Sequence, residues 1–277
     1  MFSLCRLSAQ VSVKVSTDQD EFLPGEALPV AARIVNRSGQ TLKLGQDNSW
    51  LKFSIEARDG YVVFQTGDVP VNHEFTLESS ERATVRANLA PYFHLPRAGH
   101  YFIRATVTIP EWNLQVTSDP KPFDVIQGAK LWEQDFGVPR SGSSNAEPEM
   151  RKYALQEANY LHSQLTLYVQ VTESTGKINK VFPIGRMLSF SQPEPEVDRV
   201  SNLHVLYQNG PRMFRYTVIN PNGDIILRQT YDVTTRPRLM RDADGNFNVV
   251  GGARRITHDD VPPLAFTGTN ASGTPQP

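Results

Sequence analysis

The sequence predicts an all-β protein with two domains, and three observations support this prediction. Apolar and polar residues alternate over short segments, turn signals recur about every ten residues, and no helical period is sustained. A chain of 277 residues is long enough for about two domains. The 18 glycines and 20 prolines are enough for many turns but too few for a disordered or collagen-like chain.

The first domain is predicted at residues 11–127 as a β-sandwich. Valines at positions 11, 13 and 15 alternate with polar residues, which gives a strand one apolar face. Pro24 and Gly25 then form a turn before a second strand at 28–36. Further strands are predicted at 41–44, 51–57, 61–65, 75–77, 83–88, 100–109, 114–118 and 122–126.

Three segments of this domain resemble a known family. They are the run from Val13 to the Phe-Leu-Pro-Gly-Glu sequence that ends at Glu26, the Ala-Arg-Ile-Val-Asn-Arg-Ser-Gly sequence at 32–39, and residues 95–105. Together they resemble an extracellular immunoglobulin-like module, closest in pattern to the macroglobulin-type and bacterial surface Ig-like domains. The resemblance covers residues 11–126 and implies an Ig-like β-sandwich, but it leaves the function open. The cysteine pair of antibody domains is missing, because Cys5 is the single cysteine.

Residues 1–10 resemble the remnant of a secretory signal peptide. They are largely apolar and end in the small-residue step Leu7-Ser8-Ala9. This pattern predicts an extracytoplasmic protein, which is secreted, periplasmic or held at the cell surface. A frayed terminus of a cytosolic protein is the alternative.

Residues 128–149 are predicted as an interdomain linker. Small polar residues and prolines dominate 137–149, whereas 130–136 could extend the sandwich or reach back over the second domain. After the linker, residues 150–164 fit either a helix stripe or a weak strand, and the pattern leaves both open.

The second domain is predicted at 150–256 as an antiparallel meander of six to eight strands. Similar apolar segments recur at 167–171, 203–207 and 247–251. The Asn-Pro-Asn-Gly sequence at 220–223 is a strong hairpin signal, because Asn-Gly accepts positive φ angles. Thr175-Gly176 and Asp244-Gly245 predict similar turns. Residues 257–277 are predicted as a disordered tail because they contain few apolar side chains.

The composition excludes several classes of function. The net charge of −1 argues against sequence-independent binding of nucleic acid, and no apolar run is long enough to predict a transmembrane helix. A single cysteine argues against disulfide frameworks and cysteine-rich metal sites. The sequence also lacks a Gly-x-Ser-x-Gly nucleophile elbow and a Gly-rich phosphate loop.

Four groups of residues deserve comparison with known chemistry, and each has a simpler structural explanation. The six histidines, His73, His94, His100, His162, His204 and His258, contain no pair spaced to bind a metal from one element. Asp242-x-Asp244-Gly245-Asn246 resembles the start of a calcium loop but is better explained as a turn. Glu194, Glu196 and Asp198 could pair as glycosidase acids but are expected in a solvated, proline-rich loop. The arginines at 215, 228, 236, 238, 241, 254 and 255 could bind an anion, but exposed strand faces also favour arginine.

The sequence therefore predicts a non-catalytic exported protein with a surface-binding or structural role through its Ig-like module. It predicts no catalytic, cofactor-binding or metal-binding residue and no cofactor. A protein or glycan surface is the expected kind of partner, and nucleic acid is not. Two alternatives stay open: a small hydrolase acting at the domain junction, and a proteinase-inhibitor or assembly module.

Overall fold

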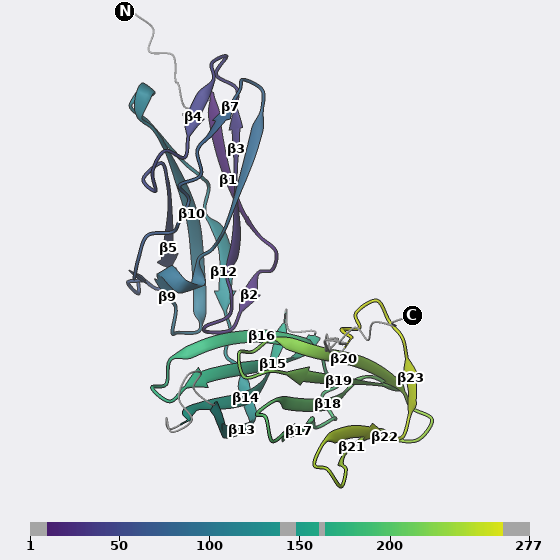
Figure 1. Cartoon of the computed structure of the whole chain (residues 1–277). Helices are drawn as coiled ribbons and strands as arrows, with labels where there is room; N and C mark the ends of the chain where they lie inside the picture. Colours follow the sequence, from purple (N-terminus) through teal and green to yellow (C-terminus); the bar gives the residue numbers. More distant parts are fainter. Residues whose placement is uncertain (1–9, 139–147, 161–163, 263–277) are drawn as a thin grey trace, which may run out of the picture. The chain divides into compact units, whose positions relative to one another are not determined.

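A computed structural model describes residues 10–138, 148–160 and 164–262 (Figure 1). The described chain is built almost entirely from antiparallel strands, which confirms the predicted all-β class. It divides into two compact units, with residues up to Ala129 in the body of the first and most residues from Lys130 onward in the second. Within the described residues, no helix has the length and apolar character needed to cross a membrane.

The first unit contains a three-stranded sheet in the order β1-β3-β8 (Figure 1, purple to blue). Its strands are β1 (Val11–Thr17), β3 (Pro29–Asn36) and β8 (Arg82–Asn88), and both pairings are antiparallel. Exposed and buried residues alternate along β1 because one face of the sheet contacts the core.

A second sheet packs against the first and is centred on β10 (Gly99–Ile109). The strand β5 (Leu51–Ala57) pairs with one edge of β10, and β11 (Leu114–Thr117) and β12 (Lys121–Val125) pair with the other. The short strand β2 (Glu21–Phe22) pairs with β12 in parallel.

One hydrophobic core lies between these two sheets, so the first unit is a β-sandwich. Strands β1 and β10 come from different sheets and contribute their alternating apolar residues to the same cluster. Tyr101 lies at the start of β10 and donates its hydroxyl to the carbonyl of Arg97 at 2.8 Å. The most completely buried large side chains of this core are Leu28, Ile34, Leu42, Leu44, Leu51, Leu89, Tyr101, Ile103, Ile109 and Phe123.

The predicted turn at Pro24 and Gly25 is present. The N–H of Glu26 donates to the carbonyl of Leu23 at 3.0 Å, and Gly25 has a φ of +80°. This conformation favours glycine because a side chain would collide with the backbone. The Glu26 carboxylate in turn accepts the N–H of Leu23 at 2.8 Å, which closes the turn before β3.

Two short pairs complete the first unit. Strand β4 (Leu42–Leu44) pairs with β7 (Phe75–Leu77), and β6 (Phe64–Gln65) pairs with β9 (Phe93–His94). The predicted strand at 61–65 is therefore shorter than expected, and β9 was not predicted.

The second unit begins with a four-stranded sheet in sequence order. Its strands are β13 (Ala129–Val138), β14 (Glu149–Tyr160), β15 (Gln164–Glu173) and β16 (Ile178–Arg186). The prediction of a linker across residues 128–149 is wrong for 129–138, because these residues form β13 and pair with β14. The open choice at 150–164 is resolved as a strand over the described residues up to 160.

A five-stranded sheet follows, in the order β17-β18-β19-β20-β23. Its strands are β17 (Glu194–Val197), β18 (Leu203–Gly210), β19 (Met213–Ile219), β20 (Ile225–Asp232) and β23 (Ala253–Arg255). The hairpin predicted at 220–223 joins β19 to β20, and the turn at 175–176 joins β15 to β16 as predicted.

The five-stranded sheet is covered on both faces. On one face, Tyr207 of β18 donates its hydroxyl to the carbonyl of Ile184 in β16 at 2.6 Å, so this face packs against the four-stranded sheet. On the other face, the hairpin of β21 (Arg238–Arg241) and β22 (Phe247–Val250) packs over a small cluster that includes Leu206. The predicted meander is therefore divided into two sheets and a hairpin, and its ten strands from β14 to β23 exceed the expected six to eight.

The two predicted terminal segments are only partly described. Residues 1–9 of the predicted signal remnant lie outside the described residues. The tail predicted as disordered from residue 257 is ordered in its described part, since Val261 exchanges two backbone hydrogen bonds with Arg228 of β20. Residues 263–277 of that tail also lie outside the described residues.

Candidate functional site

Strand β8 forms an edge of the first sandwich. It pairs with β3, and no other described strand pairs with its second edge. The N–H of Leu89 donates to the carbonyl of Leu28 at 2.9 Å, which sets the bonding pattern of this ladder. Because residues alternate in an antiparallel pair, the N–H and C=O groups of Arg82, Thr84 and Arg86 point toward the free edge. These groups could pair with another extended chain.

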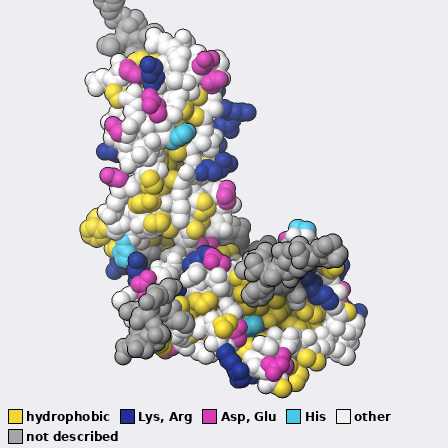
Figure 2. All heavy atoms as spheres, viewed as in Figure 1, with side chains coloured by type: hydrophobic (Ala, Val, Ile, Leu, Met, Phe, Trp, Pro, Cys, Tyr) yellow, Lys and Arg dark blue, Asp and Glu magenta, His cyan; other side chains and the backbone are white. Residues whose placement is uncertain are grey.

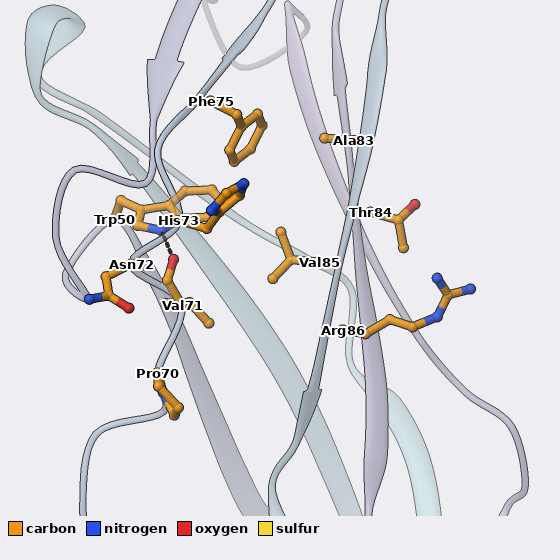
Figure 3. A pocket seen from close by; sticks show the side chains of 10 residues that line it. All are labelled: Trp50, Pro70, Val71, Asn72, His73, Phe75, Ala83, Thr84, Val85 and Arg86. Atoms are coloured by element: carbon orange, nitrogen blue, oxygen red, sulfur yellow. Dashed lines mark hydrogen bonds between the residues drawn. The ribbon is translucent and has the colours of Figure 1, made fainter. Parts of the chain in front are cut away.

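A pocket of about 490 Å³ lies beside this edge, on the inner side of β8. Figure 3 shows Val85 pointing from β8 into the pocket toward Trp50 and His73, whereas Thr84 and Arg86 point to the opposite side. Apolar and aromatic side chains dominate the lining, together with Asn72 and His73. The pocket can therefore accept an apolar group next to β8.

Trp50 fixes the wall of the pocket opposite β8. Its indole N–H donates to the carbonyl of Val71 at 2.8 Å, and its ring meets that of Phe75 edge to face at 5.6 Å (Figure 3). Gly45, with a φ of +88°, lies against the same segment, since a β-carbon at this position would lie 1.8 Å from the carbonyl oxygen of His73. The wall is therefore held by specific contacts.

The outer face of the same sheet carries a cluster of positive charge. It consists of Lys14, Arg33, Arg82 and Arg86, which are all exposed, and none of them makes an ion pair with a described residue. Lys14 lies directly opposite Arg33 in the register of β1 and β3. In Figure 2, Lys and Arg side chains project from the first unit on the side where Figure 1 draws β1 and β3. Like charges opposite each other destabilise a sheet, and an acidic ligand on this face would relieve the repulsion.

The second unit contains an Asp-His-Tyr chain that resembles a catalytic relay. His204 contacts the Asp198 carboxylate through Nε2 at 3.1 Å and the Tyr216 hydroxyl through Nδ1 at 2.7 Å. Asp198 is oriented by the N–H groups of Val200 and Asn202, which it accepts at 2.9 Å and 2.8 Å. Sequence reasoning treated Asp198 and His204 separately because a loop lies between them.

The environment of this chain favours a structural role. Burial lowers the pKa of His204 despite the opposing effect of Asp198, and only 7% of His204 is exposed. Burial also raises the pKa of the Tyr216 phenol, so the hydroxyl stays protonated at neutral pH and is a poor nucleophile. Phe247 covers the imidazole with ring centroids 5.1 Å apart. Asp198, His204 and Tyr216 therefore satisfy one another's hydrogen-bonding groups where β18, β19 and the β21-β22 hairpin meet.

The other predicted histidines are dispersed. His73 lines the pocket beside β8, His94 lies in β9, and His100 and His258 contact Asp124 and Asp259. His162 lies outside the described residues. No group of three potential metal-binding side chains occurs in the part of the chain that the structure describes.

Glu194 and Asp242, two of the acidic residues singled out from the sequence, accept hydrogen bonds from backbone N–H groups and so hold strands and turns in place. Glu194 and Glu196 lie in β17, so the expectation of a solvated loop at this position is wrong. Glu194 accepts the N–H of Leu239 at 3.0 Å and thereby ties the β21-β22 hairpin to the sheet. Asp242 accepts the N–H of Asn246 at 2.8 Å across a turn that contains Gly245, which has a φ of +86°. The contacts of Asp242 are thus those of turn chemistry.

The predicted arginines do not form one cluster. Arg254 contacts Asp260 at 2.6 Å, and Arg255 contacts Asp232 at 3.2 Å. Arg238 and Arg241 lie on the separate β21-β22 hairpin. Arg215 and Arg228 share one face of the five-stranded sheet, and Arg255 lies on the same face in the edge strand β23, opposite Thr230.

The residues along the free edge were missed by sequence reasoning. Arg82, Thr84 and Arg86 alternate with Ala83 and Val85, a pattern visible in the sequence. That pattern predicted a strand but could not show which of its edges was free. No protein-family model, curated protein or solved structure matches this chain.

Proposed function

We propose that this chain is a non-catalytic, exported binding protein whose first unit captures an extended peptide strand along the free edge of β8. The observation that carries the proposal is this edge, which has an apolar pocket on one side and a cationic face on the other. Strand addition uses backbone hydrogen bonds for affinity and alternate side chains for specificity. Both requirements are met by residues 82–86.

We further propose that the first unit is an Ig-like module, and its strand order supports this assignment. One sheet contains β1, β3 and β8, and the other contains β5, β10 and β12, as strands A, B, E and C, F, G are arranged in that family. The hydrogen bond from Tyr101 to the Arg97 carbonyl resembles the tyrosine corner at the start of strand F. In the family a strand D pairs with strand E, the counterpart of β8. A captured peptide would occupy that position.

The two sides of the edge define the chemistry of the peptide. Residues of an added strand alternate between the two faces of the sheet. Those on the inner face would enter the pocket beside Val85, Trp50 and Phe75, which favours apolar side chains. Those on the outer face would meet Arg82 and Arg86, which favours Asp or Glu. The proposed ligand is therefore an extended segment in which apolar and acidic residues alternate.

The experiment measures binding of a synthetic ten-residue peptide with alternating Val and Glu by fluorescence anisotropy. Thr84→Pro removes an N–H that points to the free edge while leaving the bonds to β3 intact, because proline is tolerated on edge strands. Thr84→Val is the matched control, since it removes the hydroxyl and keeps the N–H. We expect Thr84→Pro to weaken binding about tenfold or more and Thr84→Val to change it little.

Two further peptides test the chemistry. Replacing Glu by Lys should abolish binding, and replacing a central Val by Pro should weaken it. Equal binding by wild type and Thr84→Pro would refute strand addition. Equal binding of the Glu and Lys peptides would refute the role of the cationic face.

Export is tested separately, because it rests on residues 1–10. Amino-terminal sequencing of the mature protein from its native source should show cleavage near Gln10. An intact Met1 on a cytosolic chain would contradict the proposed compartment while leaving strand capture unaffected.

A further inference from the structure

The second unit contains a buried polar cluster on the face of the five-stranded sheet that packs against β16. In the register of β19 and β20, Arg215 lies opposite Thr230, and Thr217 lies opposite Arg228. Tyr207 of β18 lies opposite Arg215 on the other side. Two guanidinium groups and three hydroxyl-bearing side chains therefore share one small region of the sheet.

Several donors in this cluster have no partner. The Nε atoms of Arg215 and Arg228 and the hydroxyls of Thr217 and Thr230 are buried, and they make no hydrogen bond with any described residue. Thr230 is only 2% exposed. Buried donors without an acceptor are costly, so a cluster of four indicates a place where an acceptor can bind.

Gly185 provides the space for this cluster. It has a φ of +147°, and a β-carbon at this position would lie 2.6 Å from the Tyr207 hydroxyl oxygen and 3.1 Å from Nη1 of Arg215. Any other residue would push against both side chains. A glycine in β16 thus allows the Arg215 guanidinium to lie next to the Tyr207 ring.

The charges in the cluster are unbalanced. Nη2 of Arg215 contacts the carboxylate of Asp259 at 3.2 Å, but the Asp259 side chain is 43% exposed. Arg228 makes no ion pair with a described residue. Burial raises the pKa of Tyr207 to about 12 against the opposing effect of Arg215 and Arg228, so its phenol stays neutral and supplies no negative charge. The positive charge of Arg228, a half-buried side chain, is therefore left without a counter-ion among the described residues.

We propose that Arg215, Arg228 and Thr230 form a binding site for a small carboxylate ligand. A planar guanidinium presents Nε and Nη donors as a fork that matches the two oxygens of a carboxylate. The contact between Asp259 and Arg215 shows the same chemistry within the chain. This site is independent of strand capture by the first unit.

Asp259 is a competitor for this site. It belongs to the short segment that continues to Val261, whose backbone pairs with that of Arg228 along the edge of β20. The carboxylate is therefore tethered beside the site, with 43% of its side chain exposed. A free carboxylate ligand would have to displace it from Arg215 or bind next to it at Arg228, so removing its charge should favour the ligand.

The experiment follows the thermal unfolding midpoint and calorimetric binding with succinate as the probe and sulfate as the comparison, at constant ionic strength. The variants are Arg228→Gln, Arg228→Lys and Asp259→Asn in the full chain. Arg212→Gln is the matched control, because Arg212 is an exposed arginine in the turn between β18 and β19. Near-ultraviolet circular dichroism checks that each variant keeps its packing.

We expect saturable binding of succinate to the wild-type protein. Arg228→Gln should weaken this binding about tenfold or more. Arg228→Lys should also weaken it substantially, because lysine keeps the positive charge but lacks the paired Nε and Nη donors of arginine. Asp259→Asn should tighten binding several-fold, and Arg212→Gln should leave it unchanged. Equal binding by wild type and Arg228→Gln would overturn the site. Unchanged succinate affinity in Asp259→Asn would show that Asp259 does not compete with the ligand. A protein that binds sulfate but not succinate would contradict the assignment of a carboxylate ligand.

Discussion

The indole N–H of Trp50 donates to the carbonyl oxygen of Val71 at 2.8 Å, and this bond joins the start of β5 to the segment that lines the pocket beside β8. Both groups are buried, so neither can exchange its partner for water. The bond holds two parts of the pocket wall together. In the proposed strand addition, this wall would face the apolar side chain that enters the pocket beside Val85.

Replacing Trp50 tests this relationship. Trp50→Phe keeps an aromatic ring but leaves the Val71 carbonyl without a donor, so we expect a loss of about 1–3 kcal/mol in the free energy of unfolding. Urea denaturation followed by circular dichroism measures it. Affinity for the Val-Glu peptide should fall as well. Unchanged stability together with unchanged affinity would show that the bond does not hold the wall.

Gly45 is expected to be required for the stability of the segment around His73 that forms this pocket wall. Alanine at this position suffers both an unfavourable φ and a collision with the His73 carbonyl, so the segment must move. Gly39 is the matched control, since its φ is also positive, at +80°, but nothing lies within 4 Å of an added β-carbon. Gly39→Ala should cost about 1–2 kcal/mol, and Gly45→Ala should cost clearly more. Similar losses in the two variants would contradict the close approach.

The buried imidazole of His204 predicts a pH dependence of stability. Its pKa is lowered in the folded protein from 6.5, so the unfolded chain binds the proton more readily. The contribution of His204 is therefore complete above pH 6.5 and is lost as the pH falls through its folded pKa. Urea denaturation between pH 7.5 and about pH 5 should show declining stability.

Two variants isolate this effect. His204→Phe should flatten the pH dependence in that range, whereas His94→Gln, which changes an exposed histidine, should leave it in place. At lower pH a second decline is expected, because hydrogen bonds from His204 and Asn202 outweigh burial and lower the pKa of Asp198 below 3.8. A wild-type stability that is level from pH 7.5 to pH 5 would contradict this account.

The cationic face predicts that peptide binding depends on salt. Arg86→Glu should weaken binding of the Val-Glu peptide about tenfold at low ionic strength, and raising the salt concentration should reduce the difference. Lys52→Gln is the control, because Lys52 is an exposed cation on β5 in the other sheet. Arg86→Glu should also gain affinity for the peptide in which Lys replaces Glu. A salt-independent affinity would argue against the role of these charges.

Strands that are apolar on one face were predictable from sequence, and so was β18, whose run of apolar residues is buried on both faces. The strand β14 was not. Alternation at positions 11, 13 and 15 placed β1 correctly, because its other face is solvated. In β14, the consecutive residues Tyr153, Ala154 and Leu155 are all buried, so the period of two is lost and a helix fitted equally well. Pro195 suggested a loop, but β17 is an edge strand, where proline is tolerated.

The candidate sites were less predictable because they depend on pairing between distant segments. The sequence shows Arg82, Thr84 and Arg86 on one face of a strand, but only the topology shows that no described strand covers their edge. Arg215 and Arg228 were among the arginines considered for anion binding. Arg254 lies opposite Tyr231 on the other face of the sheet, and Arg255, which shares their face opposite Thr230, is paired with Asp232. Both facts require the register.

An uncovered strand edge invites two copies of the same protein to join through it. If two β8 strands paired antiparallel about Thr84, Arg82 of each copy would lie opposite Arg86 of the other. The resulting repulsion between guanidinium groups would oppose such a dimer, whereas an acidic segment would relieve it. The two arginines thus disfavour pairing between copies along this edge, and concentrated salt should be the condition under which this protein begins to self-associate.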